Sequence, residues 1–136
     1  MSATPVKEVS AEGLYDQFTN DDSTFVVVDL RREDYSQGHI KGAWNVPVTG
    51  QMTEDDLSTL LEKLNNYTQQ KNISQLDVIF HCSSSKNRGP RVANQFSAFI
   101  DQNKCYTTYQ SCVLVNGYTG WSQLFESKKD STMIEI

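Results

Sequence analysis

The chain lacks any hydrophobic run long enough to cross a bilayer. A transmembrane helix needs about 20 consecutive apolar residues, and no stretch of this 136-residue sequence approaches that length. The first ten residues, MSATPVKEVS, also lack the hydrophobic core of a secretion signal. The sequence therefore predicts a protein that neither spans a membrane nor enters the secretory route.

The chain is also short of positive charge and of cysteine. It has 12 Lys and Arg residues against 17 Asp and Glu residues, which gives a net charge of -5. This balance argues against a general nucleic-acid or anionic-membrane partner, although a local basic pocket remains compatible with it. The 3 cysteines are odd in number and match no disulfide framework. We therefore expect free thiols in a reducing, cytoplasmic compartment, with no resident metal and no bound cofactor.

Strand-like runs alternate with amphipathic helices along the chain. Short β-branched runs predict strands at 24–30, 44–48, 76–82 and 111–115. Apolar residues at helical spacing predict helices at 10–18, 53–67, 89–100 and 120–127. Ser10 and Thr53 are good N-caps for the first two helices. The pattern predicts a single α/β domain, 1–136, whose central parallel sheet carries helices on both faces.

The stretch VIFHCSSSKNRGPRVANQF, residues 78–96, places Cys82 at the tip of a buried strand and Arg88 six positions later. In a parallel α/β sheet, ligands bind outside the C-terminal ends of the strands. The loop 83–87 leads into a helix N-terminus, whose unpaired N–H groups and positive dipole end form an anion site. Arg88 adds a planar fork that can hold two oxygens of a tetrahedral anion. Because the same features stabilise a thiolate, the pattern predicts an oxyanion site with a nucleophile beneath it.

The three cysteines have different sequence surroundings, which predict different roles. A buried free cysteine is usually no more than a small apolar side chain. Cys112 lies in the strand-like run SCVLV and Cys105 in a polar connection, so we expect both to be structural. Cys82 differs because three serines, a lysine, an asparagine and an arginine follow it, and a core needs none of these.

Three segments resemble a known family. HCSSSKNRGPRVA resembles the active-site loop of the rhodanese-like superfamily, in its cell-cycle phosphatase and arsenate reductase branch. VVVDLRREDYSQGHIKGAWNVPV resembles that superfamily's other signature, and SCVLVNGYTGW its closing strand, turn and helix. The likeness covers about 25–125, and DLRRED, SKNRGP and SC-LV-G are similar to the yeast-type arsenate reductase family. The resemblance implies a rhodanese-like fold and reduction of arsenate to arsenite, with electrons from glutathione and glutaredoxin.

The loop departs from related families in informative ways. From Cys82 to Arg88 it spans seven residues, whereas sulfurtransferases of this superfamily generally have a loop one residue shorter. Phosphatase relatives usually carry an acidic residue for leaving-group protonation, and 83–87 contains none. A weak general acid would cost ester cleavage roughly 10²–10⁴-fold in rate. With no second cysteine close in sequence, we favour an external resolving thiol, while a relay through Cys105 or Cys112 stays open.

The remaining site predictions concern binding and support. We expect the anion to be bound mainly by backbone N–H groups of the loop and by its polar side chains, from Ser83, Ser84, Ser85, Lys86, Asn87 and Arg88. Lys86 is also expected to face solvent and recruit anions or glutathione.

Three residues outside the loop complete the predicted site. His81 should point to the opposite face of its strand from Cys82 and act as a structural hydrogen-bonding group. Asp29 is expected to orient a neighbouring loop, and Arg31 to pair with Glu33 or Asp34.

The sequence thus favours an arsenate reductase that binds arsenate, with phosphate as a competitor and with glutathione and glutaredoxin as partners. A protein tyrosine or dual-specificity phosphatase is the alternative, and a non-catalytic phosphate-binding module is a third. The substrate range, antimonate included, and the choice between a monomer and a homodimer stay open.

Overall fold

The computed structural model describes residues 5–19, 24–83, 86–128 and 134–135, and these form one main sheet of five parallel strands. The strand order is β1-β6-β5-β2-β4. The bounds are β1 Lys7–Val9, β2 Phe25–Asp29, β4 Trp44–Asn45, β5 Leu76–His81 and β6 Tyr109–Leu114. The predicted α/β fold with a parallel sheet is confirmed, and β5, which carries Cys82 at its end, lies at the sheet centre.

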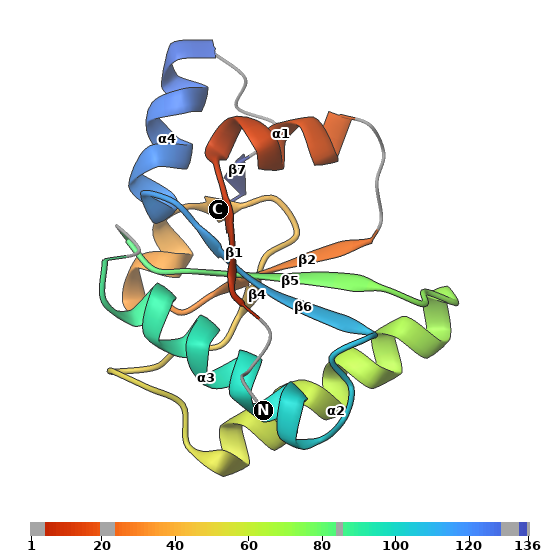
Figure 1. The fold of residues 1–136 in the computed structure, drawn as a ribbon. Coiled ribbons are helices and arrows are strands. Elements are labelled where there is room, and N and C mark those ends of the chain that lie inside the picture. The colour runs from red at the N-terminus through yellow and green to blue at the C-terminus, as the bar shows by residue number, and fades with distance from the viewer. Residues whose placement is uncertain (1–4, 20–23, 84–85, 129–133, 136) are drawn as a thin grey trace.

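Helices cover both faces of this sheet (Figure 1). The helices α1 (Ala11–Thr19) and α4 (Gly117–Lys128) lie on one face, and α2 (Glu54–Lys71) and α3 (Arg88–Gln102) lie on the other. A short antiparallel pair, β3 (His39–Ile40) with β7 (Ile134–Glu135), and the 3-10 helix η1 (Glu33–Gln37) complete the described elements. Across the described ranges, no helix combines the length and apolar character needed to cross a bilayer.

Local capping explains where two of the helices begin. The Ser10 side-chain oxygen accepts the Gly13 N–H at 3.0 Å, as the sequence predicts for an N-cap. Thr53 and Asp56 form a reciprocal capping box, with distances of 3.1 Å and 3.0 Å. The helix α2 ends at Lys71, because the C-cap residue Asn72 has a left-handed φ of 57° that stops helix propagation.

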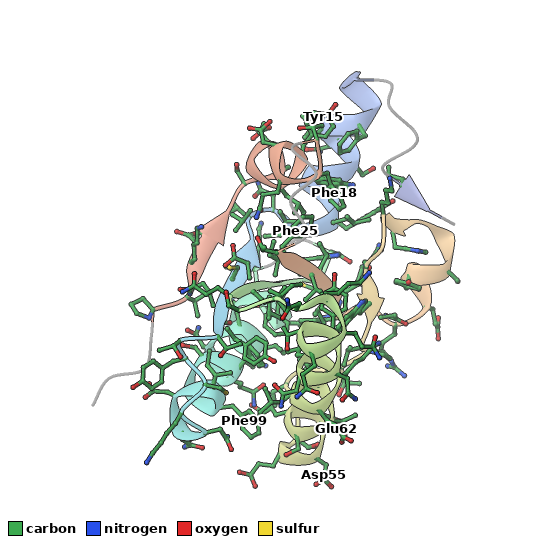
Figure 2. All side chains as sticks on the ribbon, turned by 90° about the vertical axis from the view of Figure 1, so that its right-hand side faces the viewer. Tyr15, Phe18, Phe25, Asp55, Glu62 and Phe99 are labelled. Carbon is green, nitrogen blue, oxygen red and sulfur yellow. The ribbon has the colours of Figure 1, made fainter. Side chains whose placement is uncertain are left out.

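The core consists of two apolar layers, one on each face of the sheet. The first packs α2 and α3 against the strands through residues such as Leu60, Leu64, Val92, Phe96 and Ile100. The second packs α1 and α4 through Leu14, Trp121 and Phe125, and it includes Cys112 from β6. Figure 2 shows Tyr15, Phe18 and Phe25 in the layer of α1 and Phe99 in the opposite layer. This two-sided burial explains why the strands read as continuous apolar runs.

One strand prediction needs correction, and the strand β1 was not predicted. The strand expected at 44–48 ends at Asn45, since Pro47 has no N–H to donate to a ladder. Val46 and Val48 still donate their N–H groups to Asp29 and Leu30, at 2.9 Å and 3.2 Å, so the segment follows β2 without forming a regular strand. The edge strand β1 was not predicted, because a three-residue strand with one buried side chain leaves no readable pattern.

Candidate active site

Cys82 follows directly after β5, at the C-terminal edge of the sheet. Its side chain is buried, with 4% of the residue exposed. The strands β2 and β6 are hydrogen-bonded to either side of β5, so Cys82 lies at the middle of the sheet edge. The helix α3 begins at Arg88, which brings its N-terminus to the same edge. The predicted ligands Ser84 and Ser85 lie outside the described residues.

The carbonyl groups at the start of the loop are held from the side of α4. The Cys82 carbonyl accepts hydrogen bonds from His81 Nδ1 and from the Tyr118 N–H, both at 3.0 Å. The Ser83 carbonyl accepts the Thr119 N–H at 2.8 Å. In a trans peptide the N–H points opposite to the C=O, and no cis peptide occurs in the described chain. The Ser83 N–H is therefore turned away from α4, toward the side on which an anion would bind.

Gly117 allows this close approach of α4 to the loop. Its φ of 54° is in the left-handed region, which costs most other residues free energy. A Cβ at this position would lie 2.8 Å from the Ser83 carbonyl oxygen and closer still to that of Cys82. Only glycine fits here without moving the loop. This turn lies in the segment SCVLVNGYTGW that resembles the family, but no role for Gly117 or Tyr118 was predicted.

The N-terminus of α3 is left available to a ligand. Asn87 precedes the helix with φ -122°, and no side chain of the described residues caps it there. Pro90 has no N–H, and the Arg91 N–H is bonded to the Asn87 carbonyl at 3.1 Å. The helix thus presents the N–H groups of Arg88 and Gly89, at the positive end of its dipole.

Arg88 is half-buried and tied to the segment that follows β4. Its Nη1 donates to the Val48 carbonyl oxygen at 3.3 Å. Anchoring one nitrogen restrains the guanidinium and leaves its other donors to meet an oxyanion. The contact to Val48 was not predicted. Every residue has a backbone carbonyl, so the sequence does not indicate which one Arg88 will contact.

Asp29 and Arg31 form a buried ion pair beneath the loop. Arg31 Nη2 lies 2.8 Å from Asp29 Oδ2, and Arg31 Nε lies 3.1 Å from Asp29 Oδ1. The same Nη2 donates to the Gly38 carbonyl at 2.7 Å, and the guanidinium lies 4.0 Å from the centre of the Tyr118 ring. Among the described side chains, the carboxylate paired with Arg31 is that of Asp29 and not that of Glu33; the Asp34 side chain lies outside the described set, so a pair with Asp34 stays a prediction.

His81 is completely buried and links this ion pair to the loop. Because the Cys82 carbonyl can only accept, His81 Nδ1 must donate in their 3.0 Å hydrogen bond. His81 Nε2 lies 3.7 Å from Asp29 Oδ2, which is too far for a hydrogen bond. Burial lowers the pKa of His81 below its ordinary value, and the Asp29 charge opposes this only in part. His81 therefore holds the Cys82 carbonyl as a neutral imidazole.

The other loop side chains and thiols lie apart from this arrangement. Lys86 and Asn87 are both exposed, and Lys86 lines a groove together with Pro90 of α3. Burial raises the pKa of Cys112 to about 12. Cys105 is half-buried, its Sγ lies 3.6 Å from the Ile100 carbonyl oxygen, and burial raises its pKa as well.

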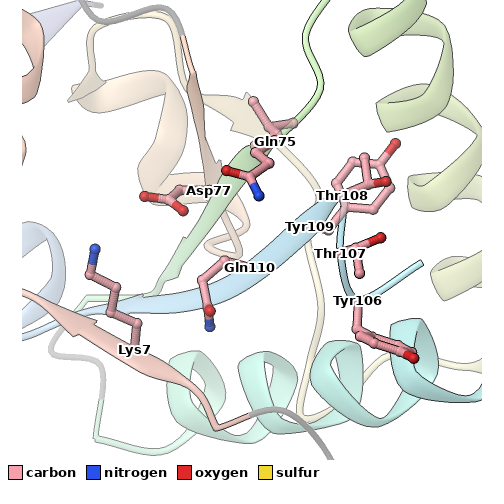
Figure 3. Close-up of a pocket in the computed structure, with 9 residues that line it drawn as sticks. Lys7, Gln75, Asp77, Tyr106, Thr107, Thr108, Tyr109 and Gln110 are labelled. Atoms are coloured by element: carbon pink, nitrogen blue, oxygen red, sulfur yellow. The ribbon is translucent and has the colours of Figure 1, made fainter. Parts of the chain in front are cut away.

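A polar cavity of about 270 Å³ lies at the other end of the sheet (Figure 3). It is lined by the starts of β5 and β6 and by the connection before β6, including Asp77, Thr108 and Gln110. In a parallel sheet this is the end away from Cys82. The cavity is therefore separate from the candidate active site.

Comparisons with known proteins agree with this geometry. Residues 10–124 match the model of the rhodanese-like domain. The chain is 40% identical over 116 residues to arsenical-resistance protein 2 of Saccharomyces cerevisiae, covering 85% of this chain and 88% of that protein. Its fold is similar to the As-Sb reductase of Leishmania major, with a TM-score of 0.77, 22% identity and coverage of 96% and 85%.

A phosphatase relative has a similar structure. Ygr203w, described as a yeast protein tyrosine phosphatase of the rhodanese family, has a TM-score of 0.72 and 27% identity, with 98% of this chain and 94% of that chain covered. The domain match spans most of the chain and includes the whole Cys82 loop. The chain belongs to the rhodanese-like domain family.

Proposed function

We propose that this chain is an arsenate reductase in which Cys82 is the nucleophile. The observation that carries the proposal is its 40% identity, over 85% of the chain, to a yeast protein named for arsenical resistance. The loop chemistry supports it, because 83–87 contains no carboxylic acid. Ester cleavage must protonate an alkoxide leaving group, whereas arsenate loses hydroxide or water, for which a strong general acid matters less.

Arsenate binds at the N-terminus of α3 in this mechanism. The N–H groups of the loop, together with those of Arg88 and Gly89, face its oxygens at the positive end of the helix dipole. Arg88, anchored to the Val48 carbonyl at 3.3 Å, adds further donors and a full positive charge. Phosphate has the same shape and charge, so it competes for this site.

The reaction then passes through two sulfur bonds. The Cys82 thiolate attacks arsenic and forms an S–As bond, and a hydroxide leaves as water after taking up a proton. The thiolate of glutathione attacks Cys82 Sγ, so that an S–S bond forms and the S–As bond breaks. The electron pair of that bond passes to arsenic, which is reduced from arsenic(V) to arsenic(III) and leaves as arsenite. Glutaredoxin or a second glutathione clears the mixed disulfide by thiol exchange.

The positions of the other thiols favour an external reductant. Cys112 is fully buried inside the sheet, and burial raises its pKa to about 12. Cys105 lies beyond the far end of α3, whose 15 residues span about 22 Å. Neither thiol is placed to attack Cys82. Glutathione and glutaredoxin fill this need in a reducing, cytoplasmic compartment, which the free thiols also fit.

A coupled assay tests the proposal. Arsenate-dependent NADPH oxidation through glutathione reductase and glutaredoxin is measured beside hydrolysis of p-nitrophenyl phosphate. We expect clear arsenate reduction and slow or undetectable hydrolysis by the parent. Cys82→Ser should lose arsenate turnover, because a hydroxyl has almost no anionic form at neutral pH. Cys105→Ser and Cys112→Ser should keep most of it.

Two outcomes would change the assignment. Rapid aryl phosphate hydrolysis without arsenate-dependent glutathione oxidation would promote a phosphatase, the second candidate, which the similarity to a yeast protein tyrosine phosphatase favours. Loss of turnover in folded Cys105→Ser, with this thiol found disulfide-bonded to Cys82 in the parent, would replace the external thiol by an internal relay.

A further inference from the structure

A groove of about 370 Å³ runs beside the active-site loop, between α3 and the edge strand β1. This volume falls within the roughly 300–1,000 Å³ that small-molecule sites occupy. Its apolar lining comes from four side chains: Val6, Pro90, Val113 and Val115. The polar cavity of Figure 3 is a different one, at the other end of the sheet.

Polar groups of both signs complete the lining of this edge groove. Glu8 of β1 supplies a negative charge, and Lys86 of the active-site loop supplies a positive charge. Two amide side chains, Asn94 and Asn116, also line it. All four are exposed and therefore within reach of a ligand from solvent. This combination fits a small zwitterion that carries amide groups between its charges.

The backbone of β1 adds a surface that can bind a peptide. Among the described residues, β1 is an edge strand that is paired only with β6. The Val9 carbonyl accepts the Val115 N–H at 2.8 Å, so Val9 faces β6. Backbone groups of successive residues alternate between the two sides of a strand. The N–H and C=O of Glu8 therefore point to the open edge, where an extended peptide could hydrogen-bond to them.

The edge groove reaches the loop that carries Cys82. Lys86 belongs to the same short loop as Cys82, four residues later. Asn116 directly precedes Gly117, where an added Cβ would collide with the Cys82 carbonyl. One end of the groove, at Lys86 and Asn116, therefore lies next to the backbone segments that carry and support Cys82.

We propose that the edge groove binds glutathione and directs its thiol at Cys82. The ammonium group of the tripeptide faces Glu8, one of its carboxylates faces Lys86, and its peptide groups lie along the open edge of β1. The inference rests on the proposed function, which needs an external thiol, and adds the place where that thiol binds. The thiol reacts as described above, by attack on Cys82 Sγ with loss of arsenite.

Steady-state kinetics of Glu8→Lys test the charge complementarity. Reversing this charge should raise the KM for glutathione about tenfold, because a favourable pair becomes a repulsive one. The KM for arsenate should stay within twofold of the parent value. Dithiothreitol carries no charge, so the rate with this reductant should not fall. Glu62→Lys is the matched control, since Glu62 is exposed on α2 (Figure 2) and does not line the groove.

Direct binding separates this inference from the reductase assignment. S-methylglutathione cannot react, so it is titrated into the ¹⁵N-labelled parent chain and followed by amide chemical shifts. We expect shifts at Val6, Glu8, Asn94 and Val115, and their loss in Glu8→Lys. Such shifts without arsenate turnover would support glutathione binding in the groove and contradict the arsenate reductase assignment. Arsenate turnover with an unchanged KM for glutathione in Glu8→Lys, and no shifts in the groove, would overturn the groove alone.

Discussion

The two arginines of the site, Arg31 and Arg88, have different roles. Arg31 is committed to Asp29 and to the Gly38 carbonyl, at 2.8 Å and 2.7 Å, and it is buried. Removing one member of such a buried pair costs about 3–5 kcal/mol, because the other charge is left uncompensated. Arg31 therefore supports the fold of the site, while the charge available to an anion comes from Arg88 and the N-terminus of α3.

Arg88→Lys tests this division. Lysine keeps the charge but cannot hold the Val48 carbonyl and an oxyanion in one planar fork. We expect kcat/KM for arsenate to fall about 10²-fold, the loss typical of one well-placed oxyanion donor. Alkylation by iodoacetamide at neutral pH should also slow, since an ammonium group without the tie to Val48 is held less closely at the loop. The coupled NADPH assay and the alkylation rate are the two measurements.

Arg91→Lys is the matched control for this substitution. Arg91 is exposed on the same helix, three residues further on, so its replacement should leave both rates within about twofold. Equal losses in the two variants would mean that the planar fork of Arg88 has no special role in binding.

At the scale of elements, α4 acts as a support for the loop. Its first N–H groups, from Tyr118 and Thr119, are used on the carbonyls of Cys82 and Ser83 instead of on a capping side chain. The helix α3 offers its own N-terminus to the opposite side of the same loop. Two helix ends thus lie against one short segment, and because α4 binds the Cys82 and Ser83 carbonyls, the Ser83 N–H is turned to the other side.

Gly117→Ala should disturb this support. The added Cβ meets the carbonyls of Cys82 and Ser83 in a backbone conformation with φ 54°. We expect a loss of about 2–4 kcal/mol in the free energy of unfolding, the sum of backbone strain and overpacking. A displaced loop should also lower arsenate turnover at least about tenfold in the protein that stays folded. Urea unfolding and the coupled assay measure the two effects.

Gly42→Ala is the control that has backbone strain without a steric collision. Gly42 has φ 73°, but no atom of the described residues lies within 4 Å of a Cβ built there. This variant should lose only about 1 kcal/mol of stability and keep its turnover. Similar losses of turnover in both variants would contradict a specific role of α4 in holding the loop.

At the scale of the whole molecule, the buried His81 couples folding to pH. Burial lowers its pKa below the ordinary value of 6.5, so the folded chain keeps it neutral where the unfolded chain protonates it. The unfolded state then binds more protons, and stability falls as the pH drops through about 6.5. Above that pH, His81 is neutral in both states and costs the folded state no stability.

His81→Asn should flatten this dependence. We expect the free energy of unfolding of the parent to fall below pH 6.5 more steeply than that of the variant, by up to about 1.4 kcal/mol per pH unit. Urea unfolding between pH 5 and pH 7.5 gives both slopes. Identical slopes would show that another group carries the acid sensitivity of the parent.

Much of the fold could be predicted because its signals are local. The helices expected at 10–18 and 53–67 begin within one residue of the observed starts, since Ser10 and Thr53 act as caps through neighbours three residues away. The continuous apolar runs of β2 and β5 correctly indicated a sheet covered on both faces. The edge strand β1 could not be predicted, because its pairing to β6 joins residues about 100 positions apart.

The candidate site also has parts that follow from the local sequence and parts that do not. A cysteine after a buried strand and an arginine at a helix start lie within seven residues of each other, so their proximity follows from the chain itself. The partners that hold them come from elsewhere in the chain: Val48 for Arg88, and Gly117 and Tyr118 for the Cys82 carbonyl. Most of these contacts use backbone carbonyls and N–H groups, which every residue type shares and which therefore leave no mark on the sequence. Only the packing of α4 and of the segment after β4 against the sheet edge decides them.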